Sequence, residues 1–255
     1  MKESQSVAGK RVLVTGGTRG LGRAISLKLA GAGASVLANY VRNEPAAQEL
    51  VELARTQPGD LQTCRADLTG RTGMEHLLET VRSWCGMSRL DSLVHCAATG
   101  VHRPLGDLTS RHFDWTFALN VRAFLELTTR LLPLFAAPAS VVAVSSLGAE
   151  RAAATYSLVG ASKAAVESLA RHMALELGPR GIRTNILCPG TVETEAWQAL
   201  PHREERLADA RRRSPLGRLV SQDEVACGAL FLCSDASSGV NGSTLVVDGG
   251  EHLPL

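Results

Sequence analysis

Apolar runs and segments of helical periodicity alternate along the whole chain. Residues 11–14 form a run without polar alternation, which is typical of a strand buried on both faces, and residues 140–145 are the most strand-like segment. After the first run, Leu21, Ile25 and Leu29 recur at the spacing that places them on one face of a helix. This alternation predicts an α/β fold with a parallel sheet.

The same pattern predicts where the elements lie. Strands are expected over residues 11–14, 35–40, 61–66, 91–95, 140–145, 184–188 and 244–247. Helices are expected after the first strand, from about residue 44, over residues 70–85, along an amphipathic stretch from Phe113 to Pro133, and through Lys163 up to Gly178 and Pro179. No linker, repeat or low-complexity tract divides the chain. We therefore predict one domain over residues 1–255, a Rossmann-type doubly wound sheet of seven parallel strands with helices on both faces. Polar residues 191–215 are expected to form a substrate-side insertion, or lid, over the cleft at the carboxyl ends of the strands.

Composition narrows the class of protein. The 255 residues are 45% hydrophobic and 20% charged with a net charge of +2, which suits an ordinary globular protein and gives no reason to expect nucleic acid or a membrane. The first six residues have no apolar core, so we expect no signal peptide. The six cysteines include no Cys-x2-Cys pair, which favours buried free thiols in a reducing cytoplasm over disulfides or zinc. The seven histidines lack metal-ligand spacing, and we expect no metal.

A glycine motif lies between the first strand and the first helix. Gly16, Gly20 and Gly22 follow the spacing Gly-x3-Gly-x-Gly. Glycine allows a sharp turn and close approach of a pyrophosphate, and the helix N-terminus offers it N–H groups and positive partial charge. In this context the motif favours dinucleotide binding over a plain turn.

The end of the second strand distinguishes the two nicotinamide cofactors. NAD sites usually have Asp or Glu there, bonded to the ribose 2′-hydroxyl. Residues 39–43 contain no acid, whereas Arg19 and Arg42 are placed to pair with a 2′-phosphate. The sequence therefore predicts NADPH, the alternative for both arginines being a solvated surface.

Thr-Gly-x3-Gly-x-Gly at residues 15–22, together with Asn120, Ser146 and Lys163 on the expected elements, resembles the short-chain dehydrogenase/reductase family, and the similarity runs from about Lys10 to Gly250. The resemblance implies association into a homotetramer or dimer through apolar faces of the long helix and the Lys163 helix. It also implies a set of cofactor-binding residues: Gly16, Thr18, Arg19, Gly20, Leu21, Gly22, Tyr40, Arg42, Asp67, Leu68, Cys96, Ala97, Lys163, Pro189, Gly190, Val192 and Thr194.

Most members of this family use Tyr-x3-Lys, but here Val159 stands four residues before Lys163. Tyr156 is the nearest tyrosine, and seven residues correspond to about 700° of helix and a rise of roughly 10.5 Å. We therefore expect Tyr156 on the approach to the helix, bending inward.

Tyr-x6-Lys is the spacing of the enoyl-thioester reductase branch. In enoyl reduction the hydride goes to Cβ and charge develops on the thioester oxygen several bonds away, so the oxyanion donor must move with it. Residues 95–104, 145–148 and 156–160 also resemble the NADPH-dependent enoyl-acyl-carrier-protein reductase of the third type. This resemblance implies catalytic roles for Tyr156, Lys163, Ser146 and Asn120.

Several alternatives stay open. His95 and Cys96 replace an asparagine pair of the family, which removes polar contacts near the cofactor ribose. The substrate acyl group is that of a fatty acid or of an unusual acid, linked to CoA or to an acidic acyl carrier protein. Residues 211–213, three arginines, are either a solvated helix face or a docking site for an acidic carrier protein or for the phosphates of CoA. His102 and His202 are candidates to line the substrate cleft. The rival functions are an NADPH-dependent carbonyl reductase of the same fold and a non-catalytic NADPH-binding regulator.

Overall fold

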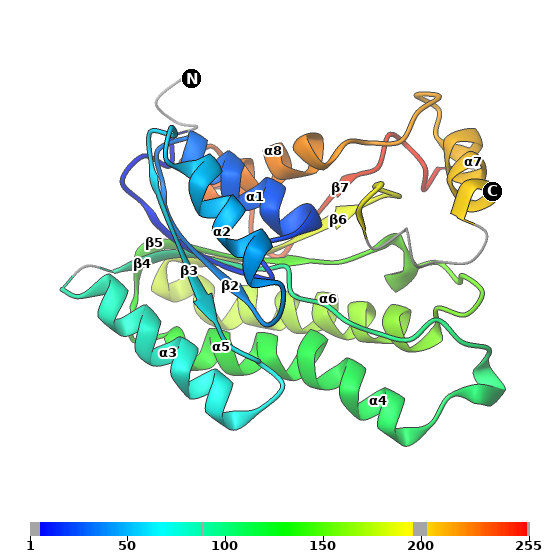
Figure 1. Cartoon of the computed structure of the whole chain (residues 1–255), viewed down its shortest axis with the longest axis horizontal. Coiled ribbons are helices and arrows are strands. Elements are labelled where there is room, and N and C mark those ends of the chain that lie inside the picture. Colours follow the sequence, from blue (N-terminus) through cyan, green and yellow to red (C-terminus); the bar gives the residue numbers. More distant parts are fainter. Residues whose placement is uncertain (1–5, 88, 196–202, 254–255) are drawn as a thin grey trace.

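The computed structural model describes residues 6–87, 89–195 and 203–253 (Figure 1). One parallel sheet has the strand order β3-β2-β1-β4-β5-β6-β7. Its strands are β1 (Arg11–Thr15), β2 (Ser35–Tyr40), β3 (Asp60–Arg65), β4 (Leu90–His95), β5 (Phe135–Val144), β6 (Ile182–Pro189) and β7 (Thr244–Val247). The predicted doubly wound sheet of seven parallel strands is confirmed.

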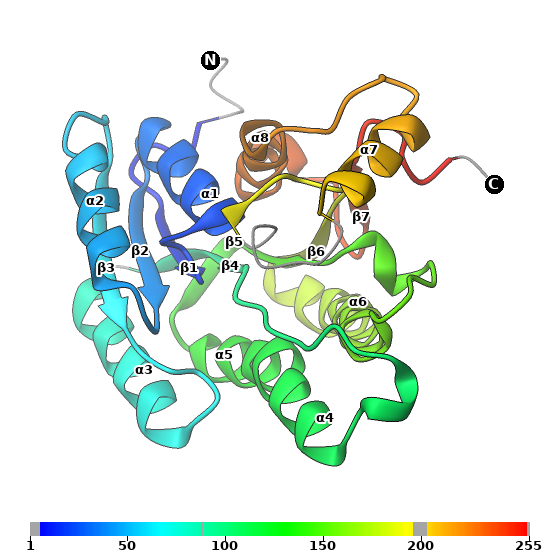
Figure 2. The same cartoon turned by 45° about the vertical axis from the view of Figure 1, so that its right-hand side comes forward.

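Helices cover both faces of the sheet (Figures 1 and 2). One face carries α1 (Gly20–Gly31), α2 (Glu44–Ala54) and α8 (Gln222–Cys233), and the other carries α3 (Arg71–Cys85), α5 (Ala123–Leu131) and α6 (Ser157–Leu177). Each layer buries its own aliphatic core, with Ile25 and Leu29 on the first face and Leu77 and Phe124 on the second. Both faces of the sheet are thereby shielded from water, which explains the uninterrupted apolar strands.

The long helix predicted between Phe113 and Pro133 is one path with a change of winding. It comprises α4 (Ser110–Phe117), a π-helical segment (Ala118–Arg122) and α5. The π segment contains an extra residue in its turn, and Asn120 there is fully buried. This change could not be predicted from the sequence, because the apolar spacing continues across it.

Three other features differ from the sequence analysis or lie outside it. Helix α8 was not predicted, and Cys227 on it is exposed rather than buried. Within the predicted insertion 191–215, α7 (Arg203–Arg213) is a helix, whereas residues 196–202, with His202, lie outside the described residues.

From β1 the chain adds β2 and β3 on one side of the sheet, and it then adds β4 and the later strands on the other side of β1. In open α/β sheets, ligands bind at this switch point, outside the carboxyl ends of the strands. Except for Asn120 in the π segment and Lys163 in α6, the predicted site residues end or follow the strands β1 to β6, so they lie at the same edge of the sheet.

Candidate active site

The turn between β1 and α1 is shaped by close backbone contacts. Gly16 and Gly20 have φ values of +63° and +50°, and a Cβ at Gly22 would lie 2.0 Å from the carbonyl oxygen of Gly16. Arg19 is the N-cap residue of α1 and makes no side-chain cap. An uncapped helix N-terminus beside glycines leaves backbone N–H groups and space for an anion, so these residues fit the pyrophosphate of a dinucleotide.

The end of β4 packs against this turn. The backbone N–H of Ala97 donates to Thr15 Oγ1 at 3.1 Å, and a Cβ at Gly16 would lie 2.9 Å from Ala97 Cα. His95 Nδ1 lies 3.1 Å from the same Thr15 hydroxyl, and its ring stacks on Phe124. Burial lowers the pKa of His95 to about 3, so the ring is neutral. His95 therefore supports β1 from inside the sheet.

Two exposed arginines lie in the turns that follow β1 and β2. Neither Arg19 nor Arg42 forms an ion pair with a described residue, whereas the nearby Arg23 pairs with Glu49 at 2.6 Å. Tyr40 ends β2, and Asp67 and Leu68 follow β3. The end of β2 is held by Asn39, which donates to the carbonyl of Ala66 at 2.9 Å. This corner therefore offers cationic side chains and no strand-end acid.

The loop after β6 returns towards the glycine turn. Pro189 ends β6, and the loop contains Gly190, Val192 and Thr194. Thr194 Cβ lies 3.7 Å from the position of a Cβ on Gly20. Val192 is buried. The cofactor positions expected from β1 and from β6 are thus neighbours.

Tyr156 directly precedes α6 and is its N-cap residue, with non-helical dihedrals. Its hydroxyl donates to Ser146 Oγ at 3.2 Å, and Ser146 follows β5. The tyrosine ring lies on Gly148, where a Cβ would be 2.4 Å from Tyr156 Cε1. Burial raises the pKa of Tyr156 and the hydrogen bond to Ser146 partly offsets this, so the phenol holds its proton at neutral pH.

Lys163 and Asn120 are buried behind this pair. Lys163 Nζ donates to the carbonyl of Val144 at 2.7 Å, and burial lowers its pKa to about 8. Asn120 accepts from the N–H of Thr99 at 2.8 Å and donates to Thr99 O and to Ser162 Oγ, both at 2.9 Å. The Asn120 side chain therefore fixes the loop after β4 against α6.

The position four residues before Lys163 is closed. Val159 is buried, and a Cβ at Gly100 would lie 2.2 Å from Val159 Cγ2. Position 159 therefore offers no phenol, and the phenol of Tyr156 lies about one turn earlier along the chain.

Two further residues lie near the site, and the sequence singled out only one of them, His102. His102 lies against Tyr156 with ring centroids 5.4 Å apart, and burial together with the charge of Arg206 on α7 lowers its pKa. Glu167, one turn after Lys163, accepts from Ser145 Oγ at 2.5 Å, and burial raises its pKa. Glu167 was missed, because a glutamate on a helix is too common to single out from the sequence.

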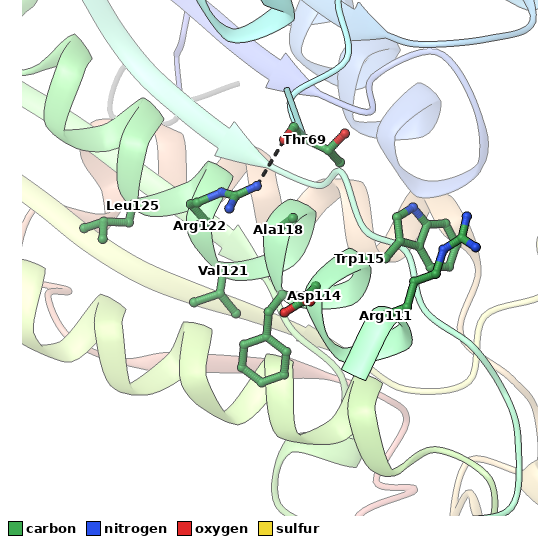
Figure 3. A pocket seen from close by; sticks show the side chains of 9 residues that line it. Thr69, Arg111, Asp114, Trp115, Ala118, Val121, Arg122 and Leu125 are labelled. Atoms are coloured by element: carbon green, nitrogen blue, oxygen red, sulfur yellow. Dashed lines mark hydrogen bonds between the residues drawn. The ribbon is translucent and has the colours of Figure 1, made fainter. Parts of the chain in front are cut away.

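A hollow of about 590 Å³ lies away from these residues, on the outer side of α4 and the π segment (Figure 3). Apolar side chains such as Trp115, Val121 and Leu125 line it, and Arg122 donates from its border to Thr69 O at 3.1 Å. It contains none of the predicted site residues.

Over the described residues, no helix combines the length and apolar character that crossing a bilayer requires. In the same part of the chain, no three His, Cys, Asp or Glu side chains gather as metal ligands would.

Known proteins resemble the chain over almost its whole length. A family model described as enoyl-(acyl carrier protein) reductase matches residues 16–252. The chain is 34% identical over 240 residues to 1-cyclohexenylcarbonyl-CoA reductase of Streptomyces collinus, covering 93% of this chain and 85% of that protein. It is 36% identical over 250 residues to L-xylulose reductase of Bos taurus, covering 96% and 97%.

Among solved structures, 7α-hydroxysteroid dehydrogenase complexed with NADH and 7-oxo glycochenodeoxycholic acid matches with a TM-score of 0.92 at 31% identity, over 98% of this chain and 97% of that one. This structure and the relatives above belong to one class of protein, although their names give different substrates. The chain therefore belongs to the short-chain dehydrogenase/reductase family and is an oxidoreductase of the kind that uses a nicotinamide cofactor.

Proposed function

We propose that the protein is an NADPH-dependent reductase of the carbon–carbon double bond of a 2-enoyl thioester. The observation that carries this proposal is the displaced phenol: Tyr156 lies beside Ser146 before α6, while Val159 is buried one turn before Lys163. A donor displaced from the usual position suits a substrate whose charged oxygen lies several bonds from the carbon that receives hydride.

The residues have distinct roles in this proposal. When bound, the nicotinamide supplies the hydride for Cβ. The Tyr156 hydroxyl, whose pKa is raised by burial, donates a hydrogen bond to the thioester oxygen as negative charge develops there. Ser146 orients Tyr156, Lys163 holds the ribose, and Asn120 fixes the loop after β4.

NADPH is the proposed cofactor because of the charge at the end of β2. Arg19 and Arg42 are exposed and make no ion pair with a described residue. A 2′-phosphate would gain charge-assisted hydrogen bonds from them, and the β2 end presents no carboxylate to repel it.

A carbonyl reductase is the second candidate. The specific observation in its favour is the 3.2 Å contact between the Tyr156 and Ser146 hydroxyls, since two neighbouring hydroxyls can also bind a carbonyl oxygen. L-xylulose reductase of Bos taurus, at 36% identity, supports the same reading.

The substrate carrier and the assembly belong to the proposal too. CoA and an acyl carrier protein are the two proposed carriers, and residues 191–215 form the substrate-side part of a single domain. We propose self-association into a dimer or tetramer through the outer surface of α4 and α5, where Phe113, Trp115 and Leu125 are 46%, 47% and 41% exposed. Of the basic side chains on α7, Arg212 and Arg213 already pair with Asp209, so carrier docking does not rest on them.

The test compares a short 2-enoyl-CoA with its 3-keto counterpart while NADPH absorbance is followed. We expect turnover of the enoyl compound, with the saturated acyl-CoA identified by mass spectrometry. Turnover of the keto compound alone would establish the second candidate. Cofactor binding without turnover of either would favour a non-catalytic role. Repeating the assay with NADH tests the cofactor separately from the substrate.

A further inference from the structure

A buried carboxylate outside every motif joins the loop after β6 to α7. Glu251 follows β7 and is 4% exposed. Its oxygens accept from the backbone N–H of Thr191 at 2.8 Å, from Thr191 Oγ1 at 2.9 Å and from Arg213 Nη2 at 2.7 Å. Thr191 belongs to the loop after β6, and Arg213 is the last residue of α7.

The turn that carries Glu251 is itself fixed. Asp248 is buried and accepts from the backbone N–H groups of Gly250 and His252, both at 2.8 Å. A Cβ at Gly190 would lie 2.5 Å from Asp248 Cβ and 3.0 Å from Glu251 Oε2, so the turn packs directly on the loop after β6. The Glu251 carboxylate is therefore held by the turn and by the loop after β6 as well as by Arg213.

We propose that Glu251 is a positioning residue that couples the cofactor-side loop to the substrate-side helix. Its carboxylate holds Thr191 and α7 in one arrangement, so that cofactor bound against the loop also stabilises α7. This inference rests on the proposed placement of the cofactor at residues 189–194 and of substrate beside α7. A buried carboxylate with one partner removed is strongly unfavourable, so loss of Arg213 also disturbs Thr191.

The chain contains a matched control for this coupling. Arg212 and Arg213 are adjacent on the last turn of α7 and both pair with Asp209, but only Arg213 reaches Glu251. Arg212→Ala and Arg213→Ala remove the same charge and one trypsin site each. A difference in cleavage or in cofactor protection between the two variants is therefore due to the contact of Arg213 with Glu251.

The first experiment is limited trypsin digestion of the full chain, with cleavage sites inside α7 assigned by mass spectrometry. Loss of a charge-assisted hydrogen bond should open α7 locally and speed cleavage about tenfold in Arg213→Ala relative to Arg212→Ala. Saturating NADPH should slow cleavage in the wild type and in Arg212→Ala, and protect Arg213→Ala much less. Arg213→Lys should lie closer to the wild type. Equal cleavage and equal protection in the two alanine variants would overturn the proposal.

The second experiment measures cofactor affinity by nicotinamide fluorescence, with NADPH and with NADH. Glu251→Gln keeps the shape but loses the charge, and we expect the dissociation constant of the preferred cofactor to rise about tenfold together with faster cleavage of α7. An unchanged dissociation constant would refute the coupling. If Glu251→Gln does not fold, the comparison of the two arginine variants still decides. Neither readout requires turnover, so a failed enoyl-CoA assay would reject the proposed function and leave this result intact.

Discussion

Two turns at the same edge of the sheet achieve close packing by different means. Where the turn after β1 meets α1, a Cβ on Gly22 would clash with the backbone oxygen of Gly16. In the turn between Ser146 and α6, a Cβ on Gly148 would clash with the ring of Tyr156. In the first turn the backbone packs on backbone, and in the second turn the backbone packs on the side chain of Tyr156.

The difference explains what each turn determines. A backbone cradle presents N–H groups to any dinucleotide and is indifferent to the substrate. A cradle for a single phenol fixes where a hydrogen bond is offered and, in the proposed mechanism, which substrate oxygen is stabilised. Damage to the first turn should affect cofactor binding, and damage to the second should affect the chemical step.

Removal of the Tyr156 hydroxyl should give the largest effect. Tyr156→Phe keeps the ring on Gly148 but removes the donor, and we expect kcat to fall by roughly 10²–10³, the loss typical of an oxyanion donor. NADPH affinity should stay close to that of the wild type. Steady-state kinetics and fluorescence titration measure the two quantities, and full activity in this variant would remove Tyr156 from the mechanism.

One methyl group on each turn tests the comparison directly. Gly22→Ala should weaken NADPH binding by about a hundredfold, because overpacking against backbone costs up to about 3 kcal/mol. Gly148→Ala should displace the Tyr156 ring and lower kcat by about tenfold while cofactor affinity changes little.

Gly239→Ala is the control for both variants, since a Cβ there meets nothing within 4 Å. If Gly148→Ala weakened NADPH binding as much as Gly22→Ala, the two turns would not be functionally separate.

Charge at the end of β2 should have a smaller effect, confined to the choice of cofactor. Arg42→Ala should reduce the preference for NADPH over NADH by about tenfold, the value of one charge-assisted hydrogen bond. The ratio of kcat/KM for the two cofactors measures it. Arg55→Ala, an exposed arginine paired with Glu52 on α2, is the control and should leave that ratio unchanged.

Lys163 should change the pH dependence of the free energy of unfolding. Its folded-state pKa of about 8 lies below the ordinary value of 10.5, so between these two pH values the unfolded chain binds more protons. The wild type should therefore gain stability relative to Lys163→Met as pH rises through this window, while below it the cost of the buried ammonium is present in full. Urea unfolding of both proteins across the window measures this difference, and parallel curves would contradict the burial effect.

Periodicity and glycine spacing predicted most of the fold. The strand β2 and the strand β7 begin and end at the expected residues, and α2 begins at Glu44. The π segment could not be predicted, because an added residue in one turn leaves the apolar spacing of α4 and α5 intact. Helix α8 was missed because its residues are apolar around most of the helix rather than on one face.

The candidate site likewise has a part that the sequence predicted and a part that it did not. Positions defined by the chain itself, such as the glycine turn and Tyr156 on the approach to α6, follow from spacing. Contacts between distant segments do not. The pairing of Thr15 with His95 and the three bonds to Glu251 join residues that are far apart in sequence, and each residue alone is unremarkable in a globular protein.

The contact between Val159 and Gly100 has an evolutionary and engineering consequence. A tyrosine at position 159 would need room that the loop after β4 now occupies with its own backbone. Exchanging Tyr156 and Val159 alone would therefore not give a phenol at position 159 room to lie in the site, because the loop around Gly100 would have to be rebuilt at the same time. Moving the phenol on this scaffold requires coordinated changes in separate parts of the gene.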